Sequence, residues 1–312
     1  LCFMEKVMLA EILLRFCLKH SFGFPLLSTH TDRGISFRPA RLCALVGFLF
    51  FVMLLPGVLV AQTEVSGEVS GEWTAEGSPY ILIDDTVIPR DEMLILRPGC
   101  TVRFNNNMRL DIHGEIQALG VEEDSVFIWS ENHDGVTGFH FHEDASEVSL
   151  FEYCRVDTTM IRLNSIHVAF RNSLFITSKI HLDHSSGEFI ENVFYTDDAS
   201  FHISGSASDS FFESNIFNGG LLDFQPGARL TFINNHIDLT MCIAQFRELI
   251  FEGGFIRRFL CSGGWDLTIT SCGITSSIFT NMENLVWTGD SEWDEETSIT
   301  SVRNCRIEGI RT

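Results

Sequence analysis

Short alternations of apolar and polar residues, separated by turn residues, run along the chain from residue 80 onward. The first four cover Tyr80–Ile83, Met93–Leu96, Thr101–Phe104 and Arg109–Ile112. A period of two predicts β-strands with one buried face, and no amphipathic helical stretch separates them. Between the second and third alternations, Pro98–Gly99 predicts a type II turn, because glycine supplies the positive φ that the third turn position requires.

From residue 151 the alternation recurs as a six-residue motif with a period near 20 residues. Each motif opens on an aromatic or aliphatic residue, and the opening residues are Phe151, Phe170, Ile190, Phe212, Ile233, Phe251, Ile269 and Val302. A period of this length, made of strands and turns, predicts a solenoid whose coils bury their apolar faces against one another. The recurring phenylalanines predict an aromatic stack in the interior.

The fourth position of the motif is mostly small, and in three repeats it is a cysteine: Cys154, Cys272 and Cys305. Six cysteines follow residue 61, and an even number in an exported chain would allow a disulfide framework. Their shared position in the repeat instead predicts that these three cysteines are stacked in the interior.

Three segments near the start of this region carry a further motif. They read Ser78-Pro79-Tyr80-Ile81, Leu94-x-Leu96-x-Pro98-Gly99-x-x-Val102-x-Phe104 and Leu110-x-Ile112-x-Gly114-x-Ile116-x-Ala118-x-Gly120. They resemble the opening coils of secreted bacterial right-handed parallel β-helix proteins of the pectin-lyase-like group, and the six-residue motif resembles the repeat strand of that group. The resemblance implies an all-β, right-handed parallel β-helix solenoid with coils of about 20 residues. Members of the group are often exported surface proteins, and many have no known activity.

An uncharged apolar stretch precedes this region. Residues 42–60 contain no charge, follow Arg38 and Arg41, and end shortly after a Pro56–Gly57 break. A basic segment, an apolar core and a small residue at the cleavage point predict a signal peptide over residues 41–61, with a membrane anchor as the alternative.

These features predict four segments. Residues 1–40 are interpreted as a non-native upstream or disordered segment, residues 62–77 as a flexible or strand-like leader, and residues 78–312 as the parallel β-helix domain. We expect a secreted or cell-surface protein that has no membrane attachment after signal cleavage. No capping element follows the last repeat, so we also expect the natural chain to continue beyond Thr312.

The charge of the region after the signal peptide limits its partners. Residues 62–312 contain 15 basic and 39 acidic residues, a net charge of −24, and Lys179 is the only lysine among them. A surface this acidic repels nucleic acid and anionic membranes. Cations and neutral sugars are compatible with it.

A second alternation precedes most of the six-residue motifs. Its tripeptides are apolar–polar–apolar and lie about one coil apart: Phe139–Phe141, Ile161–Leu163, Ile180–Leu182, Phe201–Ile203 and Leu222–Phe224. Because strand side chains alternate between faces, the central residues are predicted to form an outward row of His140, Arg162, His181, His202 and Asp223. A second row, two residues later, comprises His142, Asn164, Asp183, Ser204 and Gln225. Further along, the first row is predicted to continue through Cys242, Leu260 and Phe279.

The leading interpretation is a non-catalytic protein that binds a polysaccharide, a cell-surface glycan or another surface partner. The predicted binding residues are His140, His142, Arg162, Asn164, His181, Asp183, His202 and Asp223. These side chains supply donors and acceptors for sugar hydroxyls or carboxylates, and histidine is a poor choice for solubility alone. The opposing interpretation is a solvated strand face that only keeps the sheet soluble.

Two other functions are consistent with the sequence. A polysaccharide lyase or glycoside hydrolase acting on an acidic polysaccharide could use Asp183 and Asp223 as carboxyl groups and Arg162 as a base or carboxylate clamp. The two aspartates are predicted to lie two coils apart, roughly 9–10 Å, near the upper limit for an inverting glycosidase. No sequence motif of either enzyme group is recognisable. The third interpretation is a structural passenger segment of a larger adhesin.

No cofactor is predicted, and calcium is left open. His140 and His142 share one strand face and could form a metal site with His184 or Glu143. Carboxylates at predicted turns could hold calcium through oxygen ligands; these are Asp84, Asp85, Glu122, Glu123, Asp124, Asp197 and Asp198. Acidic residues are also ordinary at turns, so neither pattern is specific.

Overall fold

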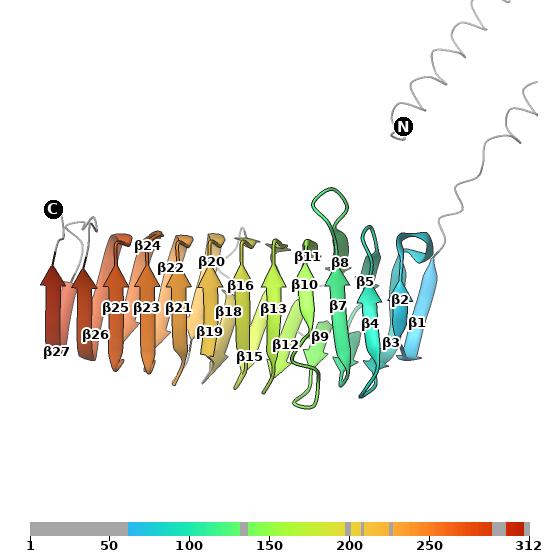
Figure 1. Cartoon of the computed structure of the whole chain (residues 1–312), viewed down its shortest axis with the longest axis horizontal. Helices are drawn as coiled ribbons and strands as arrows, with labels where there is room; N and C mark the ends of the chain where they lie inside the picture. Colours follow the sequence, from blue (N-terminus) through green and yellow to red (C-terminus); the bar gives the residue numbers. More distant parts are fainter. Residues whose placement is uncertain are drawn as a thin grey trace, which may run out of the picture. The chain divides into compact units, whose positions relative to one another are not determined.

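The computed structural model describes residues 62–131, 137–196, 201–206, 209–224, 227–288 and 298–308. Its 27 strands join in one continuous sheet, and successive coils pair in parallel along its whole length. Figure 1 shows these strands standing side by side from β1 to β27. Ile161 pairs with Ile180 and Phe170 with Phe189, so one coil advances the chain by about 19 residues. The predicted parallel β-helix solenoid is therefore confirmed.

Three ladders of parallel strands surround the core. The first contains β2 (Gly71–Trp73), β4 (Met93–Leu96), β7 (Glu115–Leu119), β10 (Leu150–Glu152), β13 (His167–Arg171), β16 (Ser186–Ile190), β19 (Asp209–Glu213), β21 (Arg229–Ile233), β23 (Glu248–Glu252) and β25 (Asp266–Thr270). The second contains β5 (Thr101–Phe104), β8 (Val126–Ser130), β11 (Cys154–Asp157), β14 (Leu174–Ile176) and β17 (Val193–Tyr195). The third contains β6 (Arg109–Ile112), β9 (Gly138–Phe141), β12 (Met160–Asn164), β15 (Lys179–Asp183) and β18 (Phe201–Ser206).

Longer strands pass through a corner and belong to more than one ladder. They are β1 (Thr63–Glu68), β3 (Tyr80–Ile88), β20 (Ile216–Phe224), β22 (His236–Ala244), β24 (Phe255–Ser262), β26 (Gly273–Thr288) and β27 (Ser298–Glu308). In β20, for example, Phe217 pairs with β17 of the second ladder and Asp223 with β18 of the third. The strands predicted over residues 93–96, 101–104 and 109–112 match β4, β5 and β6. Gly99 has a φ of 72° at the predicted turn.

Many of the corners contain a residue with a left-handed backbone conformation. After the first ladder these include Asn172 and Asn234, with φ of 50° and 53°. A buried polar side chain then accepts a backbone N–H from the coil before it. Ser173 Oγ accepts from Cys154 N at 3.0 Å, and Ser185 Oγ accepts from Ile166 N at 3.2 Å. These bonds satisfy corner amides that strand pairing leaves out, so each corner is held to its neighbour.

Three buried asparagines continue this pattern; we call Asn192, Asn215 and Asn235 the asparagine ladder. Asn192 N donates to Asn215 Oδ1 at 2.9 Å, and Asn215 N donates to Asn235 Oδ1 at 2.9 Å. The Asn215 side-chain amide also donates to the Phe189 carbonyl at 2.8 Å and to Asn235 Oδ1 at 2.9 Å. Every asparagine of the ladder is at most 4% exposed, so these groups depend on one another rather than on water.

A column of phenylalanines fills the interior behind the first ladder, as predicted. It comprises Phe151, Phe170, Phe189, Phe212, Phe232 and Phe251, whose neighbouring rings are stacked at centroid distances of 4.5–5.3 Å. All six are buried. Parallel strands in register place identical residues one strand spacing apart, which is the separation that stacked rings prefer.

The predicted register was wrong at three of the eight motifs. Phe189 and Phe232, not Ile190 and Ile233, pair with the phenylalanine column, because Ile190 and Ile233 take the next, outward position. Val302 pairs with Met282, whereas Ile307 pairs with Trp287 at the end of the column. Adjacent apolar residues hide which of the two faces inward.

Cys154 and Cys272 are buried free thiols at the same corner position, as predicted. Cys305 is not equivalent to them, because it pairs with Leu285 of β26 instead of following the column residue. Cys100 and Cys261 are also buried and free. Burial raises the pKa of Cys100 to about 11 and that of Cys272 to about 12, so these thiols are unreactive at neutral pH.

The solenoid starts earlier than the sequence suggested. Residues 62–77, predicted as a flexible or strand-like leader, contain β1, β2 and a short 3-10 helix, η1 (Ala75–Gly77). β1 pairs with β3 and β2 with β4, so this segment is strand-like and belongs to the first coil of the solenoid. The predicted signal peptide and the segment before it lie outside the described residues. Among the described residues, no helix has the length and apolar character needed to cross a membrane.

Candidate functional site

The third ladder carries an outward row of polar residues on five consecutive strands; we call it the polar row. His140, Arg162, His181, Ser204 and Asp223 are successive register partners. Their apolar neighbours point inward: Phe139, Ile161, Ile180, Ile203 and Leu222 are at most 1% exposed. Strand pairing therefore places one polar side chain about every 4.8 Å along a rigid face.

His202 does not belong to this row, so one predicted site residue was misplaced. Ile203 pairs with Ile180 on one side and with Leu222 on the other, and Ser204 pairs with His181 and Asp223. The register shifts between Phe201 and Ile203. The physical cause is Gly205, which occupies the inward position opposite Leu182 and Phe224, where alternation predicts an apolar side chain.

A second row lies two residues along the same strands. Asn164 pairs with Asp183, and Asp183 pairs with Ser206, so Ser206 takes the place predicted for Ser204. His142 N donates to the Ile112 carbonyl, which continues the ladder one residue past β9. Gln225 lies outside the described residues.

Arg162 is the second member of the polar row and differs from most arginines of the solenoid. Most of the other arginines that the structure describes form an ion pair with a carboxylate; these are Arg90, Arg97, Arg103, Arg109, Arg155, Arg171, Arg229, Arg257 and Arg303. Arg162 is exposed and has no ion-pair partner among the described residues. An unpaired guanidinium keeps its five donors available for a ligand.

His181, the next residue of the row, is held by the strand after it. Its Nδ1 lies 2.9 Å from Ser204 Oγ. Burial lowers the pKa of His181, the nearby charge of Arg162 lowers it further, and Asp183 opposes the shift. The folded-state pKa is thus below the ordinary value, so the neutral ring predominates at neutral pH and stability is lost as the pH falls through 6.5.

We predict that an NMR titration of His181 has a midpoint below 6.5 and that Arg162→Ala raises it, because the variant removes a neighbouring positive charge. Asp183→Asn is expected to lower the midpoint further. Arg257→Ala, on the second ladder, is the control and should leave it unchanged. A midpoint that does not respond to Arg162→Ala would show that the two side chains do not face each other.

The face extends one coil further toward the N-terminus than the sequence indicated. Asp111 pairs with His140, so it is the next member of the polar row, and its carboxylate accepts from His142 Nε2 at 2.9 Å and from Arg109 Nε at 2.9 Å. The period near 20 residues does not reveal Asp111, because its register partner His140 follows much more than one such period later. The apolar–polar–apolar sequence around Asp111 was the available signal.

A second group of hydrogen-bonded side chains contacts the group around Asp111 through two stacked histidine rings. The His113 and His142 rings lie 4.2 Å apart and are nearly parallel at 13°. Asp144 accepts from His113 Nδ1 at 2.7 Å and from Arg90 Nη2 at 2.6 Å. The bonds from Arg90 and His113 lower the pKa of Asp144 to about 2.

Asp144→Asn is predicted to lower the free energy of unfolding by about 1 kcal/mol at pH 6, as expected for a partly exposed ion pair. A depressed carboxyl pKa adds stability above the ordinary value of 3.8 and loses it as the pH falls toward 2. The difference between variant and wild type in urea denaturation should therefore be smaller at pH 3 than at pH 6. Glu143→Gln, at an exposed neighbour, is the control, and an equal difference at both pH values would contradict the assignment.

The two carboxylates of the hydrolase alternative are not in register with each other. Asp183 pairs with Ser206, whereas Asp223 pairs with Ser204, so the two aspartates are two strands apart and two residues out of register. Strand spacing and rise per residue put their backbone positions about 12 Å apart. The limit of about 9.5 Å for inverting glycosidases applies to the carboxyl groups and not to the backbone, so hydrolysis by this pair stays a prediction.

Metal ligands do not converge in the part of the chain that the structure describes. No three histidine, cysteine, aspartate or glutamate side chains gather there closely enough to hold an ion. His142 is instead bonded to Asp111, and His184 to Asp183 at 2.8 Å. Asp197 and Asp198 lie outside the described residues, so calcium at that turn stays a prediction.

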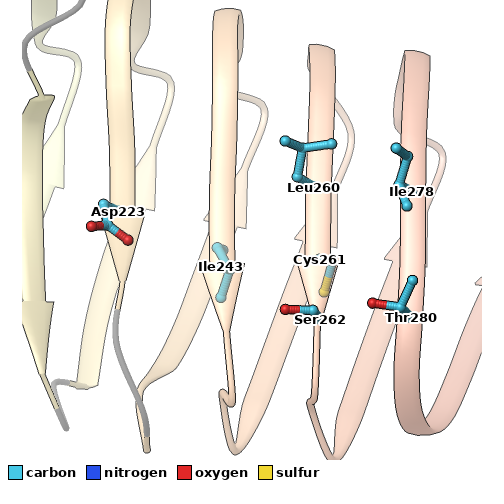
Figure 2. A pocket seen from close by; sticks show the side chains of 7 residues that line it. All are labelled: Asp223, Ile243, Leu260, Cys261, Ser262, Ile278 and Thr280. Atoms are coloured by element: carbon cyan, nitrogen blue, oxygen red, sulfur yellow. The ribbon is translucent and has the colours of Figure 1, made fainter.

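The polar row becomes apolar beyond Asp223. Asp223 pairs with Cys242, Cys242 with Leu260 and Leu260 with Ile278, so Ile278 takes the place predicted for Phe279, which is buried. A shallow groove of about 230 Å³ lies here, lined by Asp223, Ile243, Leu260, Cys261, Ser262, Ile278 and Thr280. Figure 2 shows Leu260 beside Ile278 and Ser262 beside Thr280 on neighbouring strands, with Asp223 across the groove.

Comparisons with known proteins find likenesses of structure alone. The chain is similar to an alginate lyase from Paenibacillus sp. str. FPU-7, with a TM-score of 0.25 and 10% identity over 80% of this chain and 100% of the other. It is similar to tailspike protein 3 of bacteriophage CBA120, with a TM-score of 0.29 and 12% identity over 92% and 61% of the two chains. A third likeness is to the A-module of the Azotobacter vinelandii mannuronan C-5 epimerase AlgE4, with a TM-score of 0.25 and 11% identity over 90% and 95%.

No protein-family model and no curated protein sequence matches the chain. At the identities and TM-scores above, the three likenesses assign no ligand and no activity to it. The polar row is therefore the feature of this chain that indicates a function.

Proposed function

We propose that the solenoid binds a glycan lengthwise along the polar row, without catalysis. The observation that carries the proposal is the register itself: five successive strands each place one polar residue at the same position, and four of these side chains are exposed or half-buried while Ser204 is buried. A repeating polymer can meet such a row with a repeating set of hydroxyl groups. The row offers both donors and acceptors, as sugar hydroxyls require.

The composition of the row also favours binding over mere solubility. A strand face that only keeps the sheet soluble needs charge but no directional hydrogen-bonding groups. The row instead places Arg162, which has no ion-pair partner among the described residues, between two histidines. Histidine and arginine at adjacent strands provide planar, directional donors. Because neighbouring strands hold the backbone, little order has to be gained when a ligand binds.

Rigidity and exposure together make the face accessible. Arg162 and Asn164 are exposed, and His140, His181 and Asp223 are half-buried. A half-buried side chain is held in position while its polar tip remains in reach of a ligand. The site is thus a shallow track rather than a closed pocket, as suits a polymer that enters from the side.

A glycan array with matched variants tests the proposal. The wild type should retain at least one class of glycan, and Arg162→Ala and His181→Ser should each weaken its binding by about tenfold, the scale of one hydrogen bond to a charged group. Arg257→Ala and His236→Ser change the same residue types on the second ladder and should leave binding intact. Equal losses in both pairs of variants would place the binding elsewhere.

The same preparations separate binding from cleavage. The wild type should bind uronic-acid polymers, and the mixture should not show the rise in ultraviolet absorbance that unsaturated lyase products give. A rise that Arg162→Ala abolishes would contradict the non-catalytic part of the proposal and support lyase chemistry at this face.

A further inference from the structure

The shallow groove at the end of the polar row combines two kinds of surface. Leu260 and Ile278 are register partners that point outward, and Ile278 is 44% exposed. Ser262 and Thr280 are register partners two residues along the same strands, so two hydroxyl-bearing residues lie beside the two aliphatic ones. Asp223 forms the opposite wall, two strands away, as Figure 2 shows.

We propose that this groove is a terminal subsite of the polar row and that it accepts a methyl-bearing sugar, either O-acetylated or 6-deoxy. This inference rests on the proposed function, since the sugar would belong to a glycan already lying on the row. It adds a chemical class of ligand: a glycan whose hydroxyl groups are partly replaced or masked by methyl groups.

The continuity of the register supports the assignment. Asp223 is at once the last polar member of the row and a wall of the groove. A ligand that follows the row from Arg162 to Asp223 and continues in the same direction therefore reaches Leu260 two strands beyond Asp223, roughly 9–10 Å further on, and Ile278 on the strand after that. An entirely hydroxylated chain would leave these aliphatic side chains facing polar groups, whereas a methyl group would bury apolar surface there.

The polar lining supplies the remaining contacts. The Asp223 carboxylate is an acceptor for a ring hydroxyl, and the hydroxyl groups of Ser262 and Thr280 can donate to an ester carbonyl or accept from a ring hydroxyl. The groove volume of about 230 Å³ is below that of sites for drug-sized ligands, so it suits one substituted sugar unit of a longer chain.

Matched glycan pairs on a printed array test the inference. One arm compares O-acetylated oligosaccharides with the same oligosaccharides after mild alkaline deacetylation, and the other compares L-fucosyl with L-galactosyl glycans. In at least one arm the wild type should prefer the methyl-bearing member by about tenfold, the lower end of the discrimination that one methyl or methylene group gives. The arm that responds identifies the source of the methyl group.

Variants locate the preference in the groove. Leu260→Thr combined with Ile278→Thr should remove it while leaving binding of the methyl-free member unchanged, and threonine keeps the β-propensity of both strands. Each change is also made singly, so that a fold defect of the double variant does not decide the result. Ile216→Thr is the matched control, because Ile216 is 40% exposed on the second ladder.

The outcomes distinguish this inference from the proposed function. Equal binding of both members of every pair, or a preference that survives the double variant, overturns the subsite and leaves glycan binding along the row intact. If His181→Ser weakens the binding of both members of a pair by the same factor, so that the preference ratio is unchanged, the result supports both proposals. Retention of no glycan by the wild type overturns the proposed function and the subsite with it.

Discussion

Replacing Phe212 with alanine is expected to lower the free energy of unfolding by about 3–5 kcal/mol, the largest effect of any substitution considered for this solenoid. The Phe212 ring is fully buried and stacks between Phe189 and Phe232 at centroid distances of 4.7 and 4.5 Å. It also meets Phe224 edge-on at 6.0 Å. Because parallel strand pairing fixes the backbone on both sides, the neighbours cannot close the cavity.

Urea denaturation measures the total loss, and native-state hydrogen exchange locates it. Each coil contacts only its two neighbours, so amide protection should fall most in the coils on either side of Phe212. Phe255→Ala is the matched control: Phe255 is half-buried on the outside, where it stacks on His236 at 5.2 Å. Its loss should be less than about 1 kcal/mol. Equal losses would show that Phe212 does not belong to a continuous interior stack.

Asn215→Ala should have the second largest effect, a loss of about 2–4 kcal/mol. Asn215 is fully buried, and its Oδ1 accepts from both the backbone and the side-chain nitrogen of Asn192, at 2.9 and 3.1 Å. Alanine leaves the Asn192 backbone donor without this acceptor and the Phe189 carbonyl without the donor at 2.8 Å. Each buried polar group that loses its partner costs about 1–3 kcal/mol.

The same denaturation experiment tests the asparagine ladder. Asn164→Ala, at an exposed position of β12, removes an identical side chain without leaving a buried group unsatisfied, so it should change stability by less than about 0.5 kcal/mol. Asn215→Asp should be at least as damaging as Asn215→Ala at neutral pH, because it places a carboxylate against the Phe189 carbonyl. If Asn215→Ala matched the exposed control, the ladder would contribute nothing to stability.

The architecture could be predicted from the sequence because every coil of the solenoid repeats the same alternation of inward and outward residues. Alternating residues in β4, β5 and β6 and the phenylalanines of the first ladder all require the same inward face. Parallel pairing with the next coil then determines the strand register and which inward residues stack on one another. The predicted register of the first ladder was wrong where two adjacent apolar residues could each take one inward position, as at Phe189 and Ile190, or where a coil had an unusual length.

The site was less predictable for the same reason. Four members of the polar row follow from alternation, but Ser204 does not, because Gly205 occupies the inward position that marks the strand. Asp111 was missed because an insertion separates its coil from the next one. His113 and Asp144 come from turns, and a turn residue has no period that could relate it to its neighbours.

The asparagine ladder shows a further limit. Asn192, Asn215 and Asn235 are polar residues at buried positions, and a pattern based on apolar residues treats them as turns. Only the paired amide bonds between successive coils explain why they face inward. The burial of each asparagine is explained by its hydrogen-bond partner, which lies in the next coil and not nearby in the sequence.

The central claim, that a glycan lies along the polar row, is tested most directly by titrating an oligosaccharide length series against variants at the two ends of the row. His140→Ser and Asp223→Asn change the first and last strands of the five. We expect affinity to rise with chain length to a plateau, and both variants to weaken long chains by about tenfold while short chains bind at Arg162 as before. Affinity that is independent of length, or long chains that bind both variants as tightly as the wild type, would contradict it.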